Sequence, residues 1–168
     1  YEKALQLAAR ITPAIDRRRI LEIHRRRSQV WMLLTRYAEA ITESERMRDL
    51  AQEIGDRSAE GEALMDLAVL YWATFRVENV PSVRACASQS LAIARDTGDE
   101  RLLARSLGGL ALVDQLDGRL DEADAKFTES LEIARARGFR DIAVPSNTWL
   151  GAHANWRGDF RRAVPLCL

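Results

Sequence analysis

The chain has 168 residues, of which 47% are hydrophobic and 30% charged, with 25 basic and 25 acidic side chains. Such a composition is typical of a globular protein and excludes a disordered one, and the length suits a single domain. No apolar run approaches the roughly 20 residues that span a bilayer, and there is no signal peptide, so we expect a cytoplasmic protein without a membrane segment. Cys86 and Cys167 lie in apolar helical contexts, which predicts buried free thiols.

Apolar residues recur every three or four positions almost throughout the chain, which predicts helices and no strands. The pairs Gly55-Asp56 and Gly98-Asp99 each mark the end of one helix and the start of the next. Glycine accepts the left-handed conformation that ends a helix, and aspartate can cap the free N–H groups of the following one. The predicted helices cover residues 1–11, 17–34, 37–54, 57–75, 80–97, 100–116, 120–137, 143–157 and 160–168.

An internal repeat organises these helices. Residues 118–123 (GRLDEA) reappear as residues 158–163 (GDFRRA), 40 positions later, and residues 35–40 (TRYAEA) are a looser copy. This spacing predicts stacked helical hairpins. Small residues at equivalent positions should let neighbouring helices approach: Ala68, Ala111 and Gly151 on first helices, and Ala40, Ala123 and Ala163 on second helices.

The repeat pattern Leu-(Gly/Ala)-x6-Gly-(Asp/Arg)-(aromatic or Leu)-x-x-Ala, clearest from Leu150 to Ala163, resembles the tetratricopeptide repeat (TPR). The resemblance implies an all-α, right-handed α-solenoid of antiparallel helix pairs with about nine helices. It divides the chain into one domain with a preceding second helix (1–15), three repeats (16–55, 56–98 and 99–138) and a truncated fourth (139–168). Repeats of about 40 residues look like the long variety found in multidomain bacterial signalling and transcription regulators. We therefore expect the chain to be a piece of a longer protein, and its cut ends to be capable of self-association.

The sequence departs from the repeat at several positions. The anchor residues Ala4, Ala40, Val83, Ala123 and Ala163 are spaced by 36, 43, 40 and 40 positions. The longest spacing predicts extra residues in one turn, within residues 75–79. Arg27 and Ser28 stand where leucine and a small residue are usual, and Pro165 should kink or end the last helix.

The resemblance implies a non-catalytic module that binds a protein, a peptide or another domain of its parent chain on its concave face. Aligning the first helices predicts the partner-binding residues Arg25, Gln29, Met32, Glu62, Met65, Val69, Trp72, Arg105, Leu112, Gln115, Trp149, Asn155 and Trp156. Tryptophan and arginine are favoured interface anchors, although the tryptophans serve packing equally well. Two other hypotheses remain: an effector-sensing domain for a small molecule or oligopeptide, and nucleic-acid binding through the basic cluster at Arg17–Arg27.

The basic cluster fits a solvated face with ion pairs better than a nucleic-acid surface. Its six arginines spread around the helix, and Asp16 and Glu22 interrupt them. An anionic protein partner is a further alternative. Residues 96–132 carry ten acidic side chains against four basic ones, so we expect a charge gradient along the molecule.

No motif for catalysis, a metal or a cofactor is present. His24 and His153 have no cysteine or carboxylate at metal-binding spacing, and we expect them to be solvated or partly packed. The pair Gly108-Gly109 lacks the strand and lysine of a phosphate loop and lies inside a helix. It could let a neighbouring helix approach, or clear room for a ligand.

Some TPR domains hold the C-terminal carboxylate of a peptide through a set of basic and amide side chains. Arg25, Gln29 and Arg105 partly match that set, but Asp66 would repel the carboxylate.

Overall fold

The computed structural model describes residue 3, residues 17–161 and residue 163. The described part contains no strand, and its seven α-helices are α2 (Arg17–Leu33), α3 (Tyr37–Ile54), α4 (Arg57–Ala73), α5 (Val80–Thr97), α6 (Glu100–Leu116), α7 (Leu120–Arg137) and α8 (Arg140–Trp156), with a 3₁₀ turn, η1, at Val77–Asn79. The fold class is therefore all-α, as predicted. The predicted helix 1–11, Pro165 and Cys167 lie outside the described residues, as does most of the helix predicted at 160–168.

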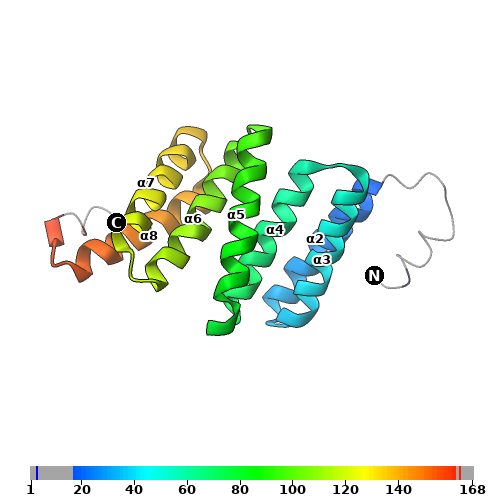
Figure 1. The fold of residues 1–168 in the computed structure, drawn as a ribbon, viewed down its shortest axis with the longest axis horizontal. Coiled ribbons are helices and arrows are strands. Elements are labelled where there is room, and N and C mark those ends of the chain that lie inside the picture. Colours follow the sequence, from blue (N-terminus) through cyan, green and yellow to red (C-terminus); the bar gives the residue numbers. More distant parts are fainter. Residues whose placement is uncertain (1–2, 4–16, 162, 164–168) are drawn as a thin grey trace.

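The helices stand side by side in chain order along the molecule (Figure 1). Each packs mainly against its neighbours in sequence, and α4 also contacts α2 and α6, while α6 contacts α8. The odd-numbered helices α3, α5 and α7 contact one another less. Helices α2, α4, α6 and α8 therefore lie closer together and form one shared face, which we call the even-helix face.

The turns that lead into α4 and α6 use the predicted signals. Gly55 and Gly98 adopt the left-handed conformation, with φ of 71° and 70°. The Asp56 carboxylate accepts a hydrogen bond from the Ala59 N–H at 3.1 Å, and Asp99 does the same for Leu102 at 3.0 Å. Each cap stabilises its helix by about 1 kcal/mol.

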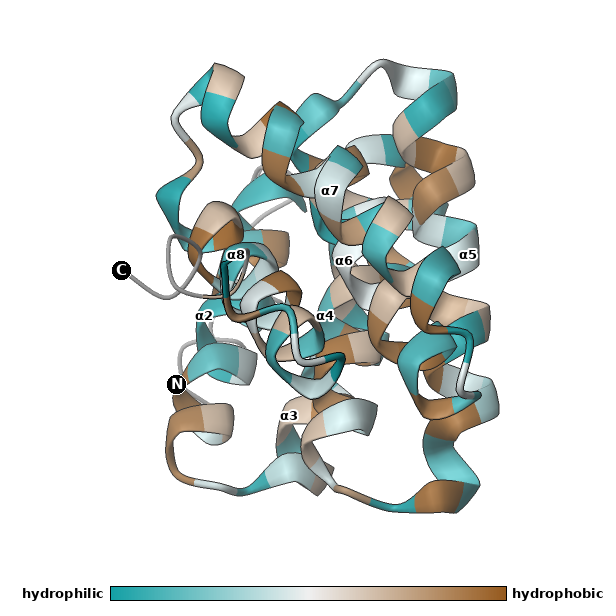
Figure 2. Cartoon of the chain, turned by 90° about the vertical axis from the view of Figure 1, so that its left-hand side faces the viewer, coloured by the Kyte–Doolittle hydropathy of each residue, from teal (hydrophilic) through white to brown (hydrophobic). Residues whose placement is uncertain are grey.

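Hydrophobic and hydrophilic residues are interspersed along the helices (Figure 2). Buried apolar side chains from neighbouring helices form the core clusters. The predicted small anchors Ala40, Ala68, Ala111, Ala123, Gly151 and Ala163 are all buried, and so is Val83. A Cβ atom at Gly61 would lie 2.4 Å from Leu102 Cδ2 and 3.0 Å from Ile93 Cγ2. All the predicted small anchors are therefore core positions, and Gly61 is a further position at which neighbouring helices leave no room for a side chain.

Buried serine hydroxyls link α4, α5 and α6 to one another, and a second set links α6, α7 and α8. Ser106 on α6 donates to Ser90 on α5 at 2.9 Å, and Ser90 donates to the Gly61 carbonyl on α4 at 3.0 Å. Forty residues later, Ser130 on α7 pairs with Ser146 on α8 at 3.1 Å and donates to the Ala104 carbonyl on α6 at 2.8 Å. These bonds satisfy polar groups that would be costly to bury alone.

Two helix boundaries differ from the prediction by more than one residue. Helix α4 ends at Ala73 instead of residue 75 because Phe75 takes a positive φ of 51°, and η1 then occupies the lengthened turn. Helix α8 begins at Arg140 instead of residue 143 and contains Pro145 as its sixth residue. Within the described residues, no helix combines the length and apolar character needed to cross a bilayer.

Candidate functional site: a groove across the even-numbered helices

Two adjoining pockets form one groove across the even-helix face. A polar pocket of about 250 Å³ lies among α2, α4 and α6. An apolar pocket of about 190 Å³ lies among α4, α6, α7 and α8. Because Val69, Arg105 and Asp141 line both, the pockets are continuous, and we refer to them together as the groove.

Ion pairs between helices fill the polar pocket. Arg105 on α6 donates to Asp66 at 2.8 Å and to Glu62, both on α4, and Arg25 on α2 reaches Glu62 at 3.5 Å. Arg101 on α6 pairs with Asp141 on α8 at 2.5 Å. The charges on this part of the groove therefore already have partners within the protein.

Arg105 is the central member of this network. Burial by itself lowers the pKa of its guanidinium, but the nearby carboxylates of Asp66 and Glu62 outweigh burial, so its pKa is raised. Arg105 therefore remains protonated in any aqueous buffer in which the protein folds. Two carboxylates hold its guanidinium in place: Glu62 binds one terminal nitrogen and Asp66 binds the other.

Aliphatic and aromatic side chains line the apolar pocket. Met65 and Leu112 form one side, and Pro145 and Trp149 from α8 form the other. Trp149 is half-buried and stacks on the buried ring of Phe127 from α7, with the ring centroids 6.4 Å apart. This stacking holds the indole in place while leaving part of it open to the groove.

The structure places eight of the thirteen predicted partner-binding residues in the groove lining: Arg25, Gln29, Met32, Met65, Val69, Arg105, Leu112 and Trp149. Glu62 lies outside this lining and binds Arg25 and Arg105. Trp72 lines a different pocket, Gln115 is engaged by His153, and Asn155 and Trp156 are exposed elsewhere.

Alignment of first helices missed several groove residues. Phe127 and Ser130 belong to α7, a second helix, and line the apolar pocket together with Gly108 of α6. Arg101 and Asp141 form an ion pair across 40 positions of sequence, which the repeat spacing itself could have suggested. The sequence also offered a signal for Ser130, because it is the first residue of the repeated segment Ser-Leu-x-Ile-Ala-Arg.

Both histidines are buried, in contrast to the solvated or partly packed state expected for them. His153 is 0% exposed, with Nδ1 2.5 Å from Asp124 Oδ1 and Nε2 2.9 Å from Gln115 Oε1. His24 Nδ1 lies 2.7 Å from Glu43 Oε2. The carboxylates come from neighbouring helices, so a search three or four positions along the sequence could not find them.

The part of the chain that the structure describes contains no cluster of histidine, cysteine and carboxylate groups able to hold a metal ion. The groove serines Ser130 and Ser146 bond to each other, and each histidine is engaged by a carboxylate. What this arrangement offers is a shaped surface with fixed charges. Cys86 is a free, half-buried thiol whose pKa is raised by burial, which makes it a weak nucleophile.

The basic cluster on α2 is largely paired with carboxylates. Arg17 binds Glu53, Arg26 binds Glu22 at 2.6 Å, and Arg27 binds Glu43 at 3.0 Å. These contacts favour the interpretation of the cluster as ion pairs and weigh against a continuous basic face for nucleic acid.

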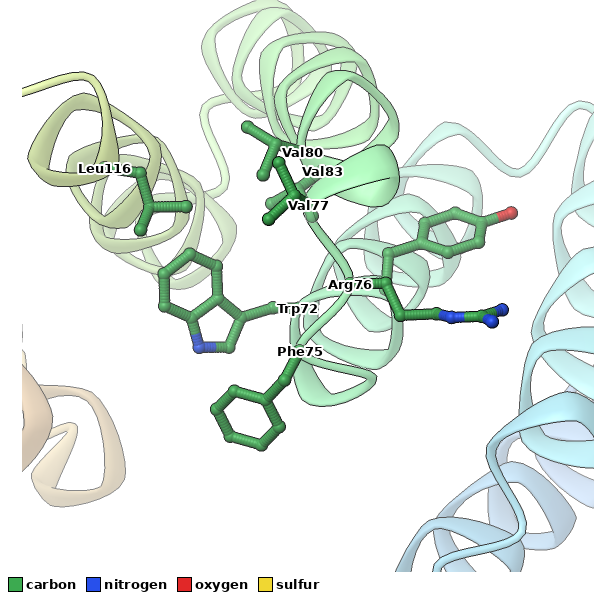
Figure 3. A pocket seen from close by; sticks show the side chains of 8 residues that line it. Trp72, Phe75, Arg76, Val77, Val80, Val83 and Leu116 are labelled. Atoms are coloured by element: carbon green, nitrogen blue, oxygen red, sulfur yellow. The ribbon is translucent and has the colours of Figure 1, made fainter.

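A separate apolar pocket of about 150 Å³ opens beside the lengthened α4–α5 turn (Figure 3). Trp72 lies between Leu116 and Phe75, with Val77 and Val80 above it, and Arg76 extends to the other side of the turn. Phe75 is 86% exposed and Val77 83% exposed. This pocket lies apart from the groove, and Trp72 is the only predicted partner-binding residue that lines it.

No family model and no curated protein matches this chain. Among solved structures it is similar to the crystal structure of BtubC (BKLC) from P. vanneervenii, with a TM-score of 0.74 and 16% sequence identity. The similarity covers 94% of this chain and 64% of that chain, so this chain spans somewhat less than two thirds of its neighbour's length. At this identity the likeness concerns the fold alone.

Proposed function

We propose that the chain is a non-catalytic protein-interaction module that holds a peptide or a partner domain in the groove. The observation that carries the proposal is the continuity of the two pockets across α2, α4, α6 and α8, lined by residues that sequence alignment had selected as partner-binding. A groove crossing several helices suits an extended segment of another chain, since it offers contacts along its whole length.

The wider setting is part of the same proposal. The helix pairs form a right-handed α-solenoid of the TPR type, and the module is the regulatory region of a larger bacterial signalling or transcription regulator in the cytoplasm. Support comes from the repeat spacing and from buried small residues at the repeat anchors. The partner is then either a separate protein or another domain of the same parent chain.

Trp149 supplies the anchor in this proposal. It is held by Phe127, presents a half-buried aromatic face to the groove and lies among apolar neighbours. Partly exposed aromatic residues in such settings often dominate binding energy, because they bury a large area with few rotatable bonds.

The test is selection of binders from a random peptide display library, followed by calorimetry on the selected peptides. Trp149→Ala should weaken binding by at least about tenfold, which corresponds to about 1.4 kcal/mol, while helical content by circular dichroism stays unchanged. Trp156→Ala is the matched control, because Trp156 is 58% exposed and lies outside the groove lining. Equal loss in both variants, or in neither, would overturn the proposal.

A small molecule bound in the apolar pocket is the second candidate, favoured by its aromatic wall and its volume of about 190 Å³. It predicts that no peptide is selected, and that one small effector raises the melting temperature.

A further inference from the structure

Two adjacent glycines lie in the middle of α6, Gly108 and Gly109. Glycine inside a helix is destabilising relative to alanine, because it loses more backbone freedom on folding. Each therefore needs a reason, and the surroundings of the two residues differ.

Gly109 is required by packing. A Cβ atom there would lie 2.7 Å from Met65 Cε and 3.6 Å from Ala87 Cβ. Met65 is only 3% exposed, so its side chain has little room to move. Gly109 thus allows α4 and α5 to approach α6.

Gly108 is not required by packing. A Cβ atom there would meet only Ser130 Oγ, at an ordinary contact distance of 3.8 Å. It lies inside a regular helix and has none of the positive φ values that favour glycine, which belong to the turn glycines. Neither sterics nor backbone conformation accounts for the missing side chain.

What remains for Gly108 is its place in the groove lining, which it shares with Gly109. It lines the apolar pocket, where Met65, Leu112, Pro145 and Trp149 surround the exposed backbone of α6. A side chain at Gly108 would project into this space. We propose that Gly108 keeps the pocket open for one large uncharged side chain of the bound segment, of the leucine, methionine or phenylalanine class. This inference rests on the proposed function of the groove and assigns its specificity.

The volume fits this class of side chain. The pocket measures about 190 Å³. An apolar cavity of about 150 Å³ is enough to hold a benzene ring. The aromatic wall formed by Trp149 and Phe127 suits an aromatic or aliphatic group.

The charges around the groove select against a charged side chain. Arg105 is engaged by Glu62 and Asp66, and Arg101 pairs with Asp141. A carboxylate or an ammonium group entering here would have to displace an existing ion pair and lose its own hydration. An uncharged side chain matches a pocket wall whose charges are already neutralised.

The experiment uses capped amino acids as probes, so it does not depend on knowing the partner. N-acetyl-phenylalanine amide and N-acetyl-leucine amide should shift the amide signals of Gly108 and Leu112 and the Trp149 indole N–H signal in saturable NMR titrations. The capped aspartate and lysine analogues should not. Gly108→Leu should abolish the shifts by filling the pocket, whereas Val144→Leu, at a 64% exposed position outside the pocket lining, should keep them.

A stability measurement separates the two glycines independently. Gly108→Ala should raise the melting temperature by about 2–4 °C, because alanine favours the helix and meets no clash. Gly109→Ala should not raise it. A lower melting temperature for Gly108→Ala would show that packing requires this glycine and would overturn the inference.

Unchanged probe affinity in Gly108→Leu, absence of saturable shifts, or equal binding of the charged probes would each overturn the inference as well. The peptide test with Trp149→Ala is separate from these outcomes. If that test succeeds while Gly108→Leu still binds the probes, the proposed function stands and the role of Gly108 fails.

Discussion

The N-terminal helix pair α2–α3 and the C-terminal pair α7–α8 are joined by the same kinds of contact, but they differ in how deeply the ion pair is buried and in the turn that follows the first helix. Between α2 and α3, the nearly buried carboxylate of Glu43 binds both His24 and Arg27. Between α7 and α8, Asp124 likewise binds His153 at 2.5 Å and Arg157, while Ser130 pairs with Ser146 as Ser44 does with Ser28. The side chains of Glu43 and Arg27 are 4% and 10% exposed, whereas those of Asp124 and Arg157 are 15% and 34% exposed. The N-terminal contact therefore contains the more deeply buried ion pair.

The two halves also differ in the residue that ends the first helix of each pair. The left-handed residue after α6 is Gly118, and after α8 it is Gly158, whereas after α2 and α4 it is Thr35 and Phe75, with φ of 57° and 51°. A residue with a Cβ pays a steric cost in this conformation that glycine avoids. The C-terminal half therefore follows the repeat pattern at these turns, and the N-terminal half departs from it.

The largest effect should come from removing the buried carboxylate. Glu43→Leu leaves the nearly buried Arg27 and His24 without their acid, which should lower the free energy of unfolding by about 3–5 kcal/mol. Chemical denaturation followed by circular dichroism measures the loss. Glu53→Gln, which breaks the exposed pair with Arg17, should change stability little.

A double variant sharpens this comparison. If the cost arises from the buried charge of Arg27 left beside an apolar side chain, Arg27→Leu/Glu43→Leu should regain part of the stability, because it replaces the ion pair with apolar side chains. A double variant less stable than Glu43→Leu alone would contradict this explanation.

A smaller effect, with a defined pH dependence, is expected at Asp114 on α6. Its carboxylate accepts hydrogen bonds from Lys126 at 2.6 Å and from Arg119. Burial raises the pKa of Asp114, but these hydrogen bonds lower it more, so the net pKa lies below its ordinary value. Asp114→Asn should cost about 1.5–3 kcal/mol at neutral pH.

The pH dependence follows from the direction of that shift. Because the pKa of Asp114 is lower in the folded than in the unfolded chain, its stabilisation is fully present above the unfolded value of about 3.9 and is lost as the pH falls through the folded value. The stability difference between wild type and Asp114→Asn should therefore shrink below about pH 4. A difference that stays constant down to pH 2 would exclude this ionic origin.

The smallest effect should come from the strained turn. Phe75→Gly relieves the positive φ and removes an 86% exposed ring, at the cost of greater freedom in the unfolded chain. We expect a net gain of at most about 1 kcal/mol, seen as a melting temperature about 2–4 °C higher. Gly118→Ala at the corresponding C-terminal turn should lower it. A loss of stability in Phe75→Gly would mean that contacts in the Trp72 pocket outweigh the strain.

The helical fold followed from the sequence because its signals are local. Glycine stops, aspartate caps and apolar periodicity located the helices, and the repeated alanines located the close helix contacts. The end of α4 was misplaced because nothing in its sequence marks Phe75 as a left-handed residue. The early start of α8 was missed because Pro145 is more usual in a first turn.

The candidate site was predictable only in part because it depends on contacts between helices. The repeat alignment found Arg105 and Trp149, which occupy the inward stripe of first helices. It could not find Phe127, which belongs to a second helix, or show that Gln115 is engaged by His153. It also left both explanations of Gly108-Gly109 open, since only the surrounding atoms show that packing requires Gly109 and does not require Gly108.

Site-specific photo-cross-linking tests whether a partner binds in the groove. A photoreactive amino acid would replace Val69, which is 40% exposed and lines both pockets, or Val144, which is 64% exposed and lies outside the groove lining. We expect an adduct to a partner from position 69 and none from position 144. Adducts from position 144 alone, or equally from both positions, would contradict it.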